Sequence, residues 1–166
     1  MVASGECPLL VINILTRTLD GQSLRDTLGG MARDILTSTS IKLTIGGKGD
    51  EKNIPDVIGG NLLMIAKEAV TNALMHASAK RLDFMLDYDT EAVTLTIRDD
   101  GCGFTPSEAP GPHEGHFGLV GFKERTARIF GQMDIRSSPG CGTTITISSP
   151  VIHPTSSARV KAATTG

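Results

Sequence analysis

Apolar residues recur at three- and four-residue spacing in three segments of the chain, and this pattern predicts amphipathic helices. The longest predicted helix covers residues 55–77, about six turns, and begins with Pro55, which suits a first helical turn. A shorter helix is predicted to begin where Ser23 and Asp26 form a capping pair, and a third is predicted in the run LVGFKERTARIF after residue 118. The apolar side of the shorter helix consists of Leu24, Leu28, Met31, Ala32, Ile35 and Leu36.

Alternation of apolar and polar residues predicts strands in other parts of the chain. An acidic tip between two of these segments, and the sequence PGCG between two others, indicate hairpin turns. With three helices and about five strands, the chain is predicted to be an α+β protein, a two-layer sandwich with the helices on one face of a mixed sheet. The alternating segments are residues 41–45, 81–89, 92–100, 132–140 and 143–151.

The two ends of the chain lack the clear patterns of the middle, so one domain is expected over residues 23–150. Residues 151–166 are mostly polar and are predicted to form a disordered tail. Within residues 1–22, the apolar run LLVINILTRTL at 9–19 fits either a strand or a buried helix, and we favour a helix. The run is too short to span a bilayer, and a soluble chain is therefore expected.

Composition and charge narrow the classes of function. With 166 residues, of which 39% are hydrophobic and 20% charged, the chain is long enough for one globular domain with a substantial core. A net charge of -2 without a basic cluster, together with only 4% aromatic residues, argues against nucleic acid as a partner. Cys7, Cys102 and Cys141 show no CxxC spacing, so we expect neither a disulfide framework nor a zinc site, and we favour a reducing compartment.

The stretch from Asp99 to Gly121 has glycines at both ends and a loop rich in Pro, Gly and His between them. A predicted strand enters the first glycine cluster, and a predicted helix leaves the second. A helix that begins just after glycines presents unpaired N–H groups and the positive end of its dipole to a ligand. The sequence therefore predicts that this segment holds an anionic group such as phosphate.

The longest predicted helix carries polar residues on one side. Glu68, Asn72, Met75 and His76 lie at i, i+4, i+7 and i+8, and the carboxylate and amide of the first two offer oxygen atoms to a hard cation such as Mg²⁺. The alternative is that Glu68 and Asn72 simply face water, and their spacing leaves both interpretations open.

Four segments together resemble a known family. EAVTNALMHASA, DDGCGF, GHFGLVGFKER and PGCGTTITI are similar, in order and approximate spacing, to the N box, the two glycine boxes and the Gly-Thr box of the GHKL ATPases. The resemblance is greatest to the ATP-binding domain of sensor histidine kinases of the NarX and DesK type, and it extends over roughly residues 23–149. It implies the Bergerat fold, a bound ATP and Mg²⁺.

The resemblance also implies roles for individual residues. Asp99 would accept the exocyclic amine of adenine, and Thr143 would lie near this carboxylate. Asn72 would be the Mg²⁺ ligand, with Glu68 orienting the metal shell, a water or the attacking group. Gly101 and Gly103 would let the base and sugar approach the backbone. Nucleotide contacts are expected from Asn72, His76, Asp99, Gly101, Gly103, Phe104, His116, Gly118, Leu119, Val120, Gly121 and Thr143.

Two departures from the family pattern bear on function. Met75 stands where the family often has Lys or Arg before the N-box histidine, which removes one positive charge near the phosphates. The histidine that such kinases phosphorylate lies in a separate two-helix dimerisation domain, and none of the histidines present fits that setting; they are His76, His113, His116 and His153.

The resemblance therefore implies the catalytic module of a cytoplasmic kinase, possible also as the cytoplasmic part of a membrane-bound sensor. It would bind MgATP and donate the γ-phosphate to a histidine of a separate dimerisation domain, for relay to a response regulator. Residues 1–22 would then include the end of the helix that leads from that domain. The alternatives are a free-standing anti-sigma factor that phosphorylates serine, and a nucleotide-gated ATPase similar to gyrase or MutL.

Overall fold

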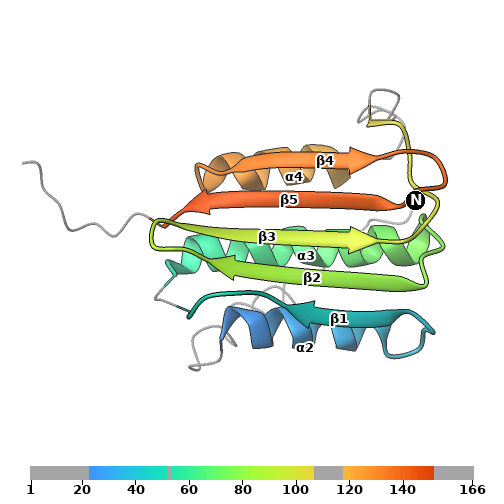
Figure 1. The fold of residues 1–166 in the computed structure, drawn as a ribbon, viewed down its shortest axis with the longest axis horizontal. Coiled ribbons are helices and arrows are strands. Elements are labelled where there is room, and N and C mark those ends of the chain that lie inside the picture. The colour runs from blue at the N-terminus through green and yellow to red at the C-terminus, as the bar shows by residue number, and fades with distance from the viewer. Residues whose placement is uncertain (1–22, 52–53, 107–117, 152–166) are drawn as a thin grey trace, which may run out of the picture.

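The computed structural model describes residues 23–51, 54–106 and 118–151 (Figure 1). The helix end predicted within residues 1–22 and the tail predicted at 152–166 lie outside the described residues. So do Gly115 and the histidines at 113, 116 and 153.

Three helices and five strands alternate along the described chain, which confirms the predicted α+β class. In order they are α2 (Leu24–Leu36), β1 (Lys42–Gly46), α3 (Asp56–Met75), β2 (Arg81–Tyr88), β3 (Ala92–Asp99), α4 (Gly118–Arg128), β4 (Gln132–Ser137) and β5 (Thr143–Pro150).

The strands form one mixed sheet in the order β1-β2-β3-β5-β4. β1 is parallel to β2, and the other neighbours are antiparallel. All three helices cover the same face of this sheet (Figure 1). Because β5 lies between β3 and β4, the end of β3 and the start of β5 are neighbours, although they are far apart in the sequence.

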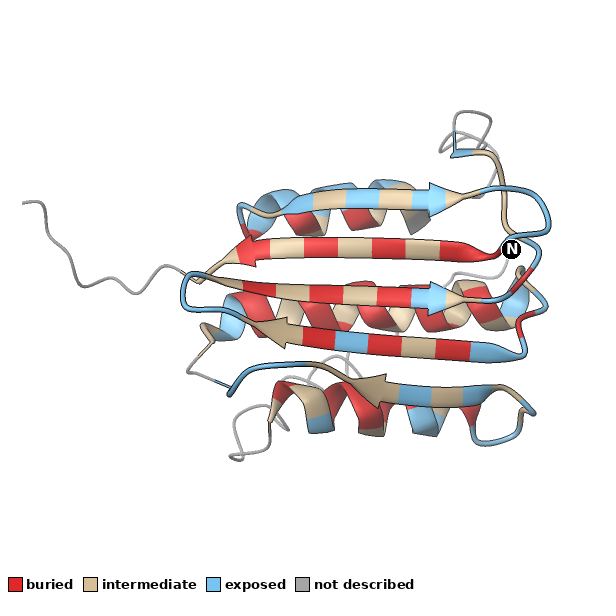
Figure 2. Cartoon of the chain, in the orientation of Figure 1, coloured by how far each residue is buried: buried red, intermediate tan, exposed pale blue. Residues whose placement is uncertain are grey.

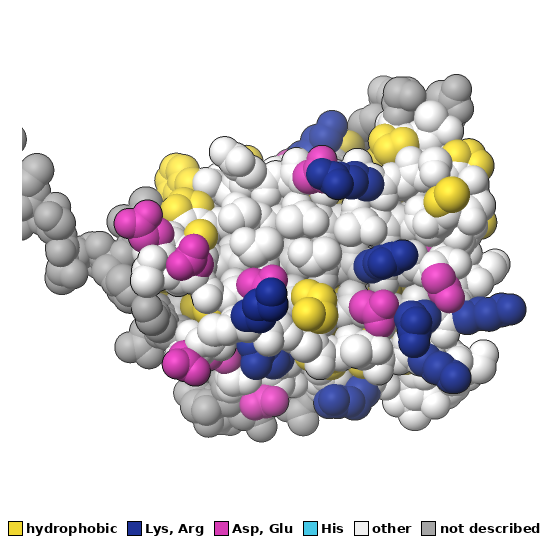
Figure 3. Space-filling model, in the orientation of Figure 1, with side chains coloured by type: hydrophobic (Ala, Val, Ile, Leu, Met, Phe, Trp, Pro, Cys, Tyr) yellow, Lys and Arg dark blue, Asp and Glu magenta, His cyan; other side chains and the backbone are white. Residues whose placement is uncertain are grey.

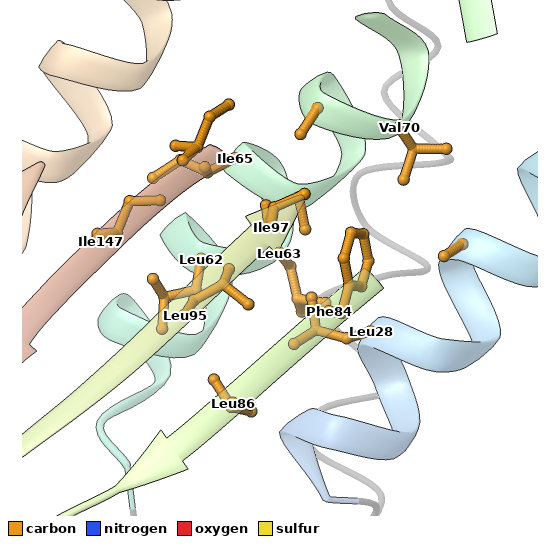
Figure 4. Packing of buried hydrophobic residues seen from close by; sticks show 14 of the residues in the cluster. Leu28, Leu62, Leu63, Ile65, Val70, Phe84, Leu86, Leu95, Ile97 and Ile147 are labelled. Carbon is orange, nitrogen blue, oxygen red and sulfur yellow. The ribbon is translucent and has the colours of Figure 1, made fainter. Parts of the chain in front are cut away.

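The hydrophobic core lies between the sheet and the helices. Alternate strand residues are buried, as the banding of β2, β3 and β5 in Figure 2 shows, and these side chains meet the apolar faces of α2 and α3 (Figure 4). Removing such side chains from water stabilises the fold by roughly 1.5–3 kcal/mol each. Fully buried members of this core include Leu28, Leu62, Leu63, Ile65, Phe84, Leu86, Leu95 and Ile147.

The opposite face of the sheet has no helix over it in the described part of the chain. Figure 3 shows side chains of both charges spread over this face, with few hydrophobic ones. The alternation in the strands accounts for the difference between the two faces, since successive residues point to opposite sides.

The boundaries of the helices agree with the sequence pattern, with one difference that concerns the site. Ser23 is the N-cap of α2, and its Oγ accepts the backbone N–H of Asp26 at 3.0 Å, as predicted. α3 ends at Met75, and His76 is its C-cap with φ -125°. The prediction that His76 continues the helical side of Glu68 and Asn72 is therefore wrong by one residue.

No helix within the described residues is long and apolar enough to cross a membrane.

Candidate functional site

A half-buried carboxylate lies at the end of β3. Asp99 is the last residue of this strand and is paired in register with Thr143, the first residue of β5. The Oδ1 atom of Asp99 accepts the backbone N–H of Gly101 at 2.8 Å. Burial raises the pKa of Asp99, and nearby backbone N–H groups, that of Gly101 first, partly offset this. Asp99 is therefore an acceptor held by the backbone N–H of Gly101, and no basic side chain of the described chain forms an ion pair with it.

The next residue, Asp100, has a different environment. Its side chain is exposed, and its Oδ1 atom accepts the backbone N–H groups of Lys80 and Arg81 at 2.8 Å each. These hydrogen bonds lower the pKa of Asp100, and the one from Arg81 has the larger effect. Through these two contacts Asp100 fixes the start of β2 beside the end of β3. The sequence shows only that two acids are adjacent at the end of a strand. It does not show which of them is half-buried and which is exposed.

The first glycine cluster, Gly101 and Gly103, passes between the end of α3 and the turn that joins β4 to β5. A Cβ atom on Gly101 would lie 2.4 Å from the carbonyl oxygen of Ala77, and one on Gly103 would lie 2.1 Å from that of Ser138. Gly103 also has φ +62°, which favours glycine. The chain's own backbone thus fills the space beside both glycines. Close packing within the protein is therefore sufficient reason for glycine at both positions, and the approach of the base and sugar to this backbone stays a prediction.

The last turn of α3 is tied to this glycine loop by backbone hydrogen bonds. The carbonyl of Asn72 accepts the N–H groups of His76 at 3.0 Å and Ala77 at 3.1 Å, and the carbonyl of Ala77 accepts the N–H of Cys102 at 2.7 Å. The thiol of Cys102 also lies 3.4 Å from the carbonyl oxygen of His76. The two sequence motifs that contain Asn72 and Asp99 therefore meet at one end of the sheet.

Glu68 and Asn72 lie one turn apart on α3, and both side chains are half-buried. One carboxylate and one amide suit Mg²⁺, which takes a few protein oxygens and completes its shell with water and substrate phosphates. Within the described residues, no group of three or more His, Cys, Asp or Glu side chains is arranged to hold a metal ion. The residues present therefore fit a metal that arrives with a phosphate ligand rather than a site made by protein side chains alone.

The second glycine cluster lies at the start of α4. The helix begins at Gly118, Leu119 is half-buried, and Val120 is 36% exposed. Among the residues that the structure describes, none comes within 4 Å of the position where a Cβ atom on Gly121 would stand. Phe122 is buried and packs α4 into the core.

The strand register places the start of α4 at the same end of the sheet as Asp99. Ser137, the last residue of β4, is opposite Thr143, whereas Gln132, the first residue of β4, is opposite Ser148. α4 packs against β4 and leads directly into its start, as the hydrogen bond from the Ser149 hydroxyl to the Ile129 carbonyl at 2.9 Å confirms. The first residues of α4 therefore lie toward the Asp99 end, close to where the last turn of α3 ends.

These contacts bring together most of the residues that the sequence predicts for the site. Asp99, Thr143 and the first glycine cluster meet directly, and the last turn of α3 joins them through the backbone. Phe104 is half-buried, and its N–H is held by the Ser137 hydroxyl at 2.9 Å. His116 lies outside the described residues. Ser137 was not predicted, because nothing in the sequence marks this serine among its neighbours.

Solved structures with the same fold are histidine kinases and their ATP-binding domains. The blue-light activated histidine kinase of Erythrobacter litoralis EL346 matches with a TM-score of 0.67 and 23% identity, over 86% of this chain and 47% of that one. The ATP-binding domain of PrrB from Mycobacterium tuberculosis matches with a TM-score of 0.61 and 18% identity, over 80% of this chain and 96% of that one. At these identities the likeness shows the fold alone.

Sequence comparison identifies the family. Residues 60–153 match the family described as histidine kinase-, DNA gyrase B- and HSP90-like ATPases. The chain belongs to this family of ATPases, as the four sequence motifs predicted.

Individual relatives are sensor kinases. The signal transduction histidine-protein kinase/phosphatase DegS of Brevibacillus brevis is 32% identical over 89% of this chain, and the nitrate/nitrite sensor protein NarQ of Escherichia coli K12 is 32% identical over 79% of it. The chain spans 37% of the length of DegS and 23% of that of NarQ. Its relatives thus place it among the ATP-binding catalytic domains of sensor histidine kinases, as predicted.

Proposed function

We propose that residues 23–150 bind MgATP and present its γ-phosphate to a histidine of a separate dimerisation domain. The observation that supports this most is the half-buried Asp99, which lies at the end of β3 against Thr143 and beside the last turn of α3. A buried acceptor at a strand end suits the exocyclic amine of adenine, because an ionised carboxylate accepts hydrogen bonds and cannot donate them. A 6-oxo purine offers no donor at that position.

The phosphates would lie between α3 and α4. Glu68 and Asn72 would hold Mg²⁺, which neutralises negative charge on the phosphates during phosphoryl transfer. The N–H groups at the start of α4, from Gly118 to Gly121, face the end of the sheet where Asp99 lies and suit an anionic group. We assign His76 and His116 to the phosphate region, and Leu119 and Val120 to its border. Because phosphoryl transfer depends mainly on positioning and charge neutralisation, these groups suffice to hold the donor.

The acceptor and the relay partner would lie in other domains or proteins. The matched region makes up only 37% of DegS and 23% of NarQ, so a dimerisation domain with a phosphoacceptor histidine is expected to act with this one. We propose that residues 1–22 lead from that domain and that residues 151–166 form a tail. A response regulator would receive the phosphate, and the ATP-binding domain would work in the cytoplasm. Neither an anti-sigma factor nor a gyrase-like ATPase is favoured by these relatives.

Isothermal titration of the 166-residue chain with ATP, ADP and GTP, with and without Mg²⁺, tests this proposal. We expect binding of ATP and ADP, tighter with Mg²⁺, and much weaker binding of GTP. Asp99→Ala should weaken ATP binding by roughly 1.5–3 kcal/mol, the usual contribution of a hydrogen bond to a charged group.

Asp134→Ala is a suitable control, because Asp134 is an exposed acid of β4 whose ion pair with Arg136 should contribute little. Unchanged ATP binding in Asp99→Ala would reject the adenine assignment, and absence of ATP binding by the wild-type chain would reject the proposed function.

A further inference from the structure

Ser137 connects three segments that surround the candidate adenine site. It is the last residue of β4 and is half-buried. Its Oγ atom accepts the backbone N–H of Phe104 at 2.9 Å, donates to the carbonyl of Gly142 at 2.9 Å, and lies 3.1 Å from the Oγ1 atom of Thr143. One hydroxyl group therefore links the loop after Asp99 to the start of β5.

Thr143 carries this connection to Asp99. The two residues are opposite each other in the β3–β5 register. Each hydroxyl has a single hydrogen. Ser137 gives its hydrogen to the Gly142 carbonyl, so the contact between the two hydroxyls must be made by the hydrogen of Thr143, which Ser137 accepts. Ser137 thus fixes the position of the Thr143 hydroxyl next to Asp99.

The backbone of Phe104 depends on the same atom. Gly103 and Gly142 both have positive φ angles, +62° and +72°, so the backbone around Phe104 and Thr143 is bent where it enters the site. A hydrogen bond from the N–H of Phe104 to a side chain of the neighbouring strand holds this bend in one position. The geometry of the loop after Asp99 therefore rests partly on Ser137.

We propose that Ser137 is a positioning residue for purine recognition: it holds the Thr143 hydroxyl and the Phe104 backbone in place on either side of Asp99, so that the carboxylate meets the 6-amino group of adenine. This inference rests on the proposed function. Ser137 does not itself contact the nucleotide, and its effect passes through Thr143 and the Phe104 backbone. The effect should therefore depend on whether the bound purine carries an amine at position 6.

The test compares two nucleotides in Ser137→Ala, Ser137→Thr and the wild-type chain. The nucleotides are ATP and purine riboside triphosphate, which has hydrogen in place of the 6-amino group, and dissociation constants are measured by calorimetry with Mg²⁺. We expect Ser137→Ala to weaken ATP binding by roughly 3- to 10-fold, the contribution of one or two neutral hydrogen bonds. Binding of the analogue should be weakened clearly less than binding of ATP. Ser137→Thr, which keeps the hydroxyl, should bind ATP with most of the wild-type affinity.

Ser138→Ala is the matched control, since Ser138 is an exposed serine of the adjacent turn. If Ser137→Ala does not fold, Ser137→Cys repeats the comparison with a side chain of similar size that donates weakly. An equal loss for both nucleotides, or no loss for ATP, would overturn the positioning role and leave the proposed function intact. A wild-type chain that does not bind ATP would overturn both.

Discussion

The two glycine clusters of the chain look alike in the sequence, but their glycines differ in how closely the rest of the protein packs against them. In the first cluster, Gly101 and Gly103 lie where an added Cβ atom would collide with the backbone of Ala77 or Ser138. In the second, no atom of the described residues lies within 4 Å of the Cβ position of Gly121, although this residue is also in the candidate site. The first cluster is therefore required by packing within the protein, whereas no such packing by the described residues requires glycine at position 121.

This difference distinguishes glycines that the fold requires from a glycine that ligand binding would explain, within one candidate site. The first cluster brings the end of α3 against the loop that follows β3, through the hydrogen bond from the N–H of Cys102 to the carbonyl of Ala77. The second cluster contributes no such contact at Gly121, so folding alone gives no reason for glycine there. Glycine in a helix interior costs about 1 kcal/mol relative to alanine, and the open space is available to a ligand. A motif match treats both clusters alike, and only the packing distinguishes them.

The largest effect is expected from Gly101→Ala. The new Cβ atom would lie 2.5 Å from the Cβ atom of Ala77 and 2.4 Å from its carbonyl oxygen, so the loop or the end of α3 must move. Overpacking of this kind costs roughly 1–3 kcal/mol, and contact with backbone points to the upper end. Urea unfolding should show a midpoint well below that of the wild-type chain.

The same substitution at Gly30, in α2, provides the control for this measurement. No described residue comes within 4 Å of its Cβ position, so Gly30→Ala should not lower the midpoint. If Gly101→Ala unfolded at the same urea concentration as Gly30→Ala, the packing explanation of the first cluster would be wrong.

Sequence pattern alone predicted the elements that position the site. The alternation in residues 81–89 and 92–100 predicted the hairpin of β2 and β3, because one face of each strand is buried and the other is not. The long apolar spacing predicted α3 for the same reason. The resemblance to the GHKL family then selected Asp99 and Asn72, and the structure places their segments together.

Other features depend on contacts between distant segments, which local pattern does not encode. The position of β5 between β3 and β4, which sets Thr143 against Asp99, follows from sheet topology. The role of Ser137 arises from that topology, since its partners lie in two different segments. The C-cap at His76 was missed because the apolar spacing continues to Ala77, two residues beyond the end of the helix.

A smaller effect of opposite sign is expected from Gly121→Ala. Because the space beside Gly121 is open and the residue lies within α4, alanine should stabilise the fold by about 0.5–1 kcal/mol. Gly30→Ala should give a similar gain, measured as a higher urea midpoint. If the phosphates lie at the start of α4, only Gly121→Ala should also weaken ATP binding in calorimetry. Destabilisation by Gly121→Ala would show that the two clusters are alike.

A still smaller gain is expected from Asp99→Asn. Burial raises the pKa of Asp99, so the ionised carboxylate costs stability at neutral pH, where the unfolded chain ionises freely. Asparagine removes that cost, and the variant should unfold at a slightly higher urea concentration than the wild-type chain at pH 7. The difference should shrink as the pH falls through the raised pKa and Asp99 becomes protonated. Asp134→Asn, at an exposed acid, should show no such dependence on pH.

The smallest effect should come from Asp100→Asn, with the opposite sign. Backbone N–H groups of Arg81 and Lys80 hold the pKa of Asp100 below its ordinary value of 3.8, so its ionised form stabilises the fold. This contribution is complete above the ordinary pKa and is lost as the pH falls through the lowered one. Asp100→Asn should therefore lower the urea midpoint at pH 7 and match the wild-type chain in strong acid. Because Asp100 is exposed, solvent screens the interaction and the change should be modest. If Asp99→Asn and Asp100→Asn changed stability in the same direction at pH 7, burial would not distinguish the two acids.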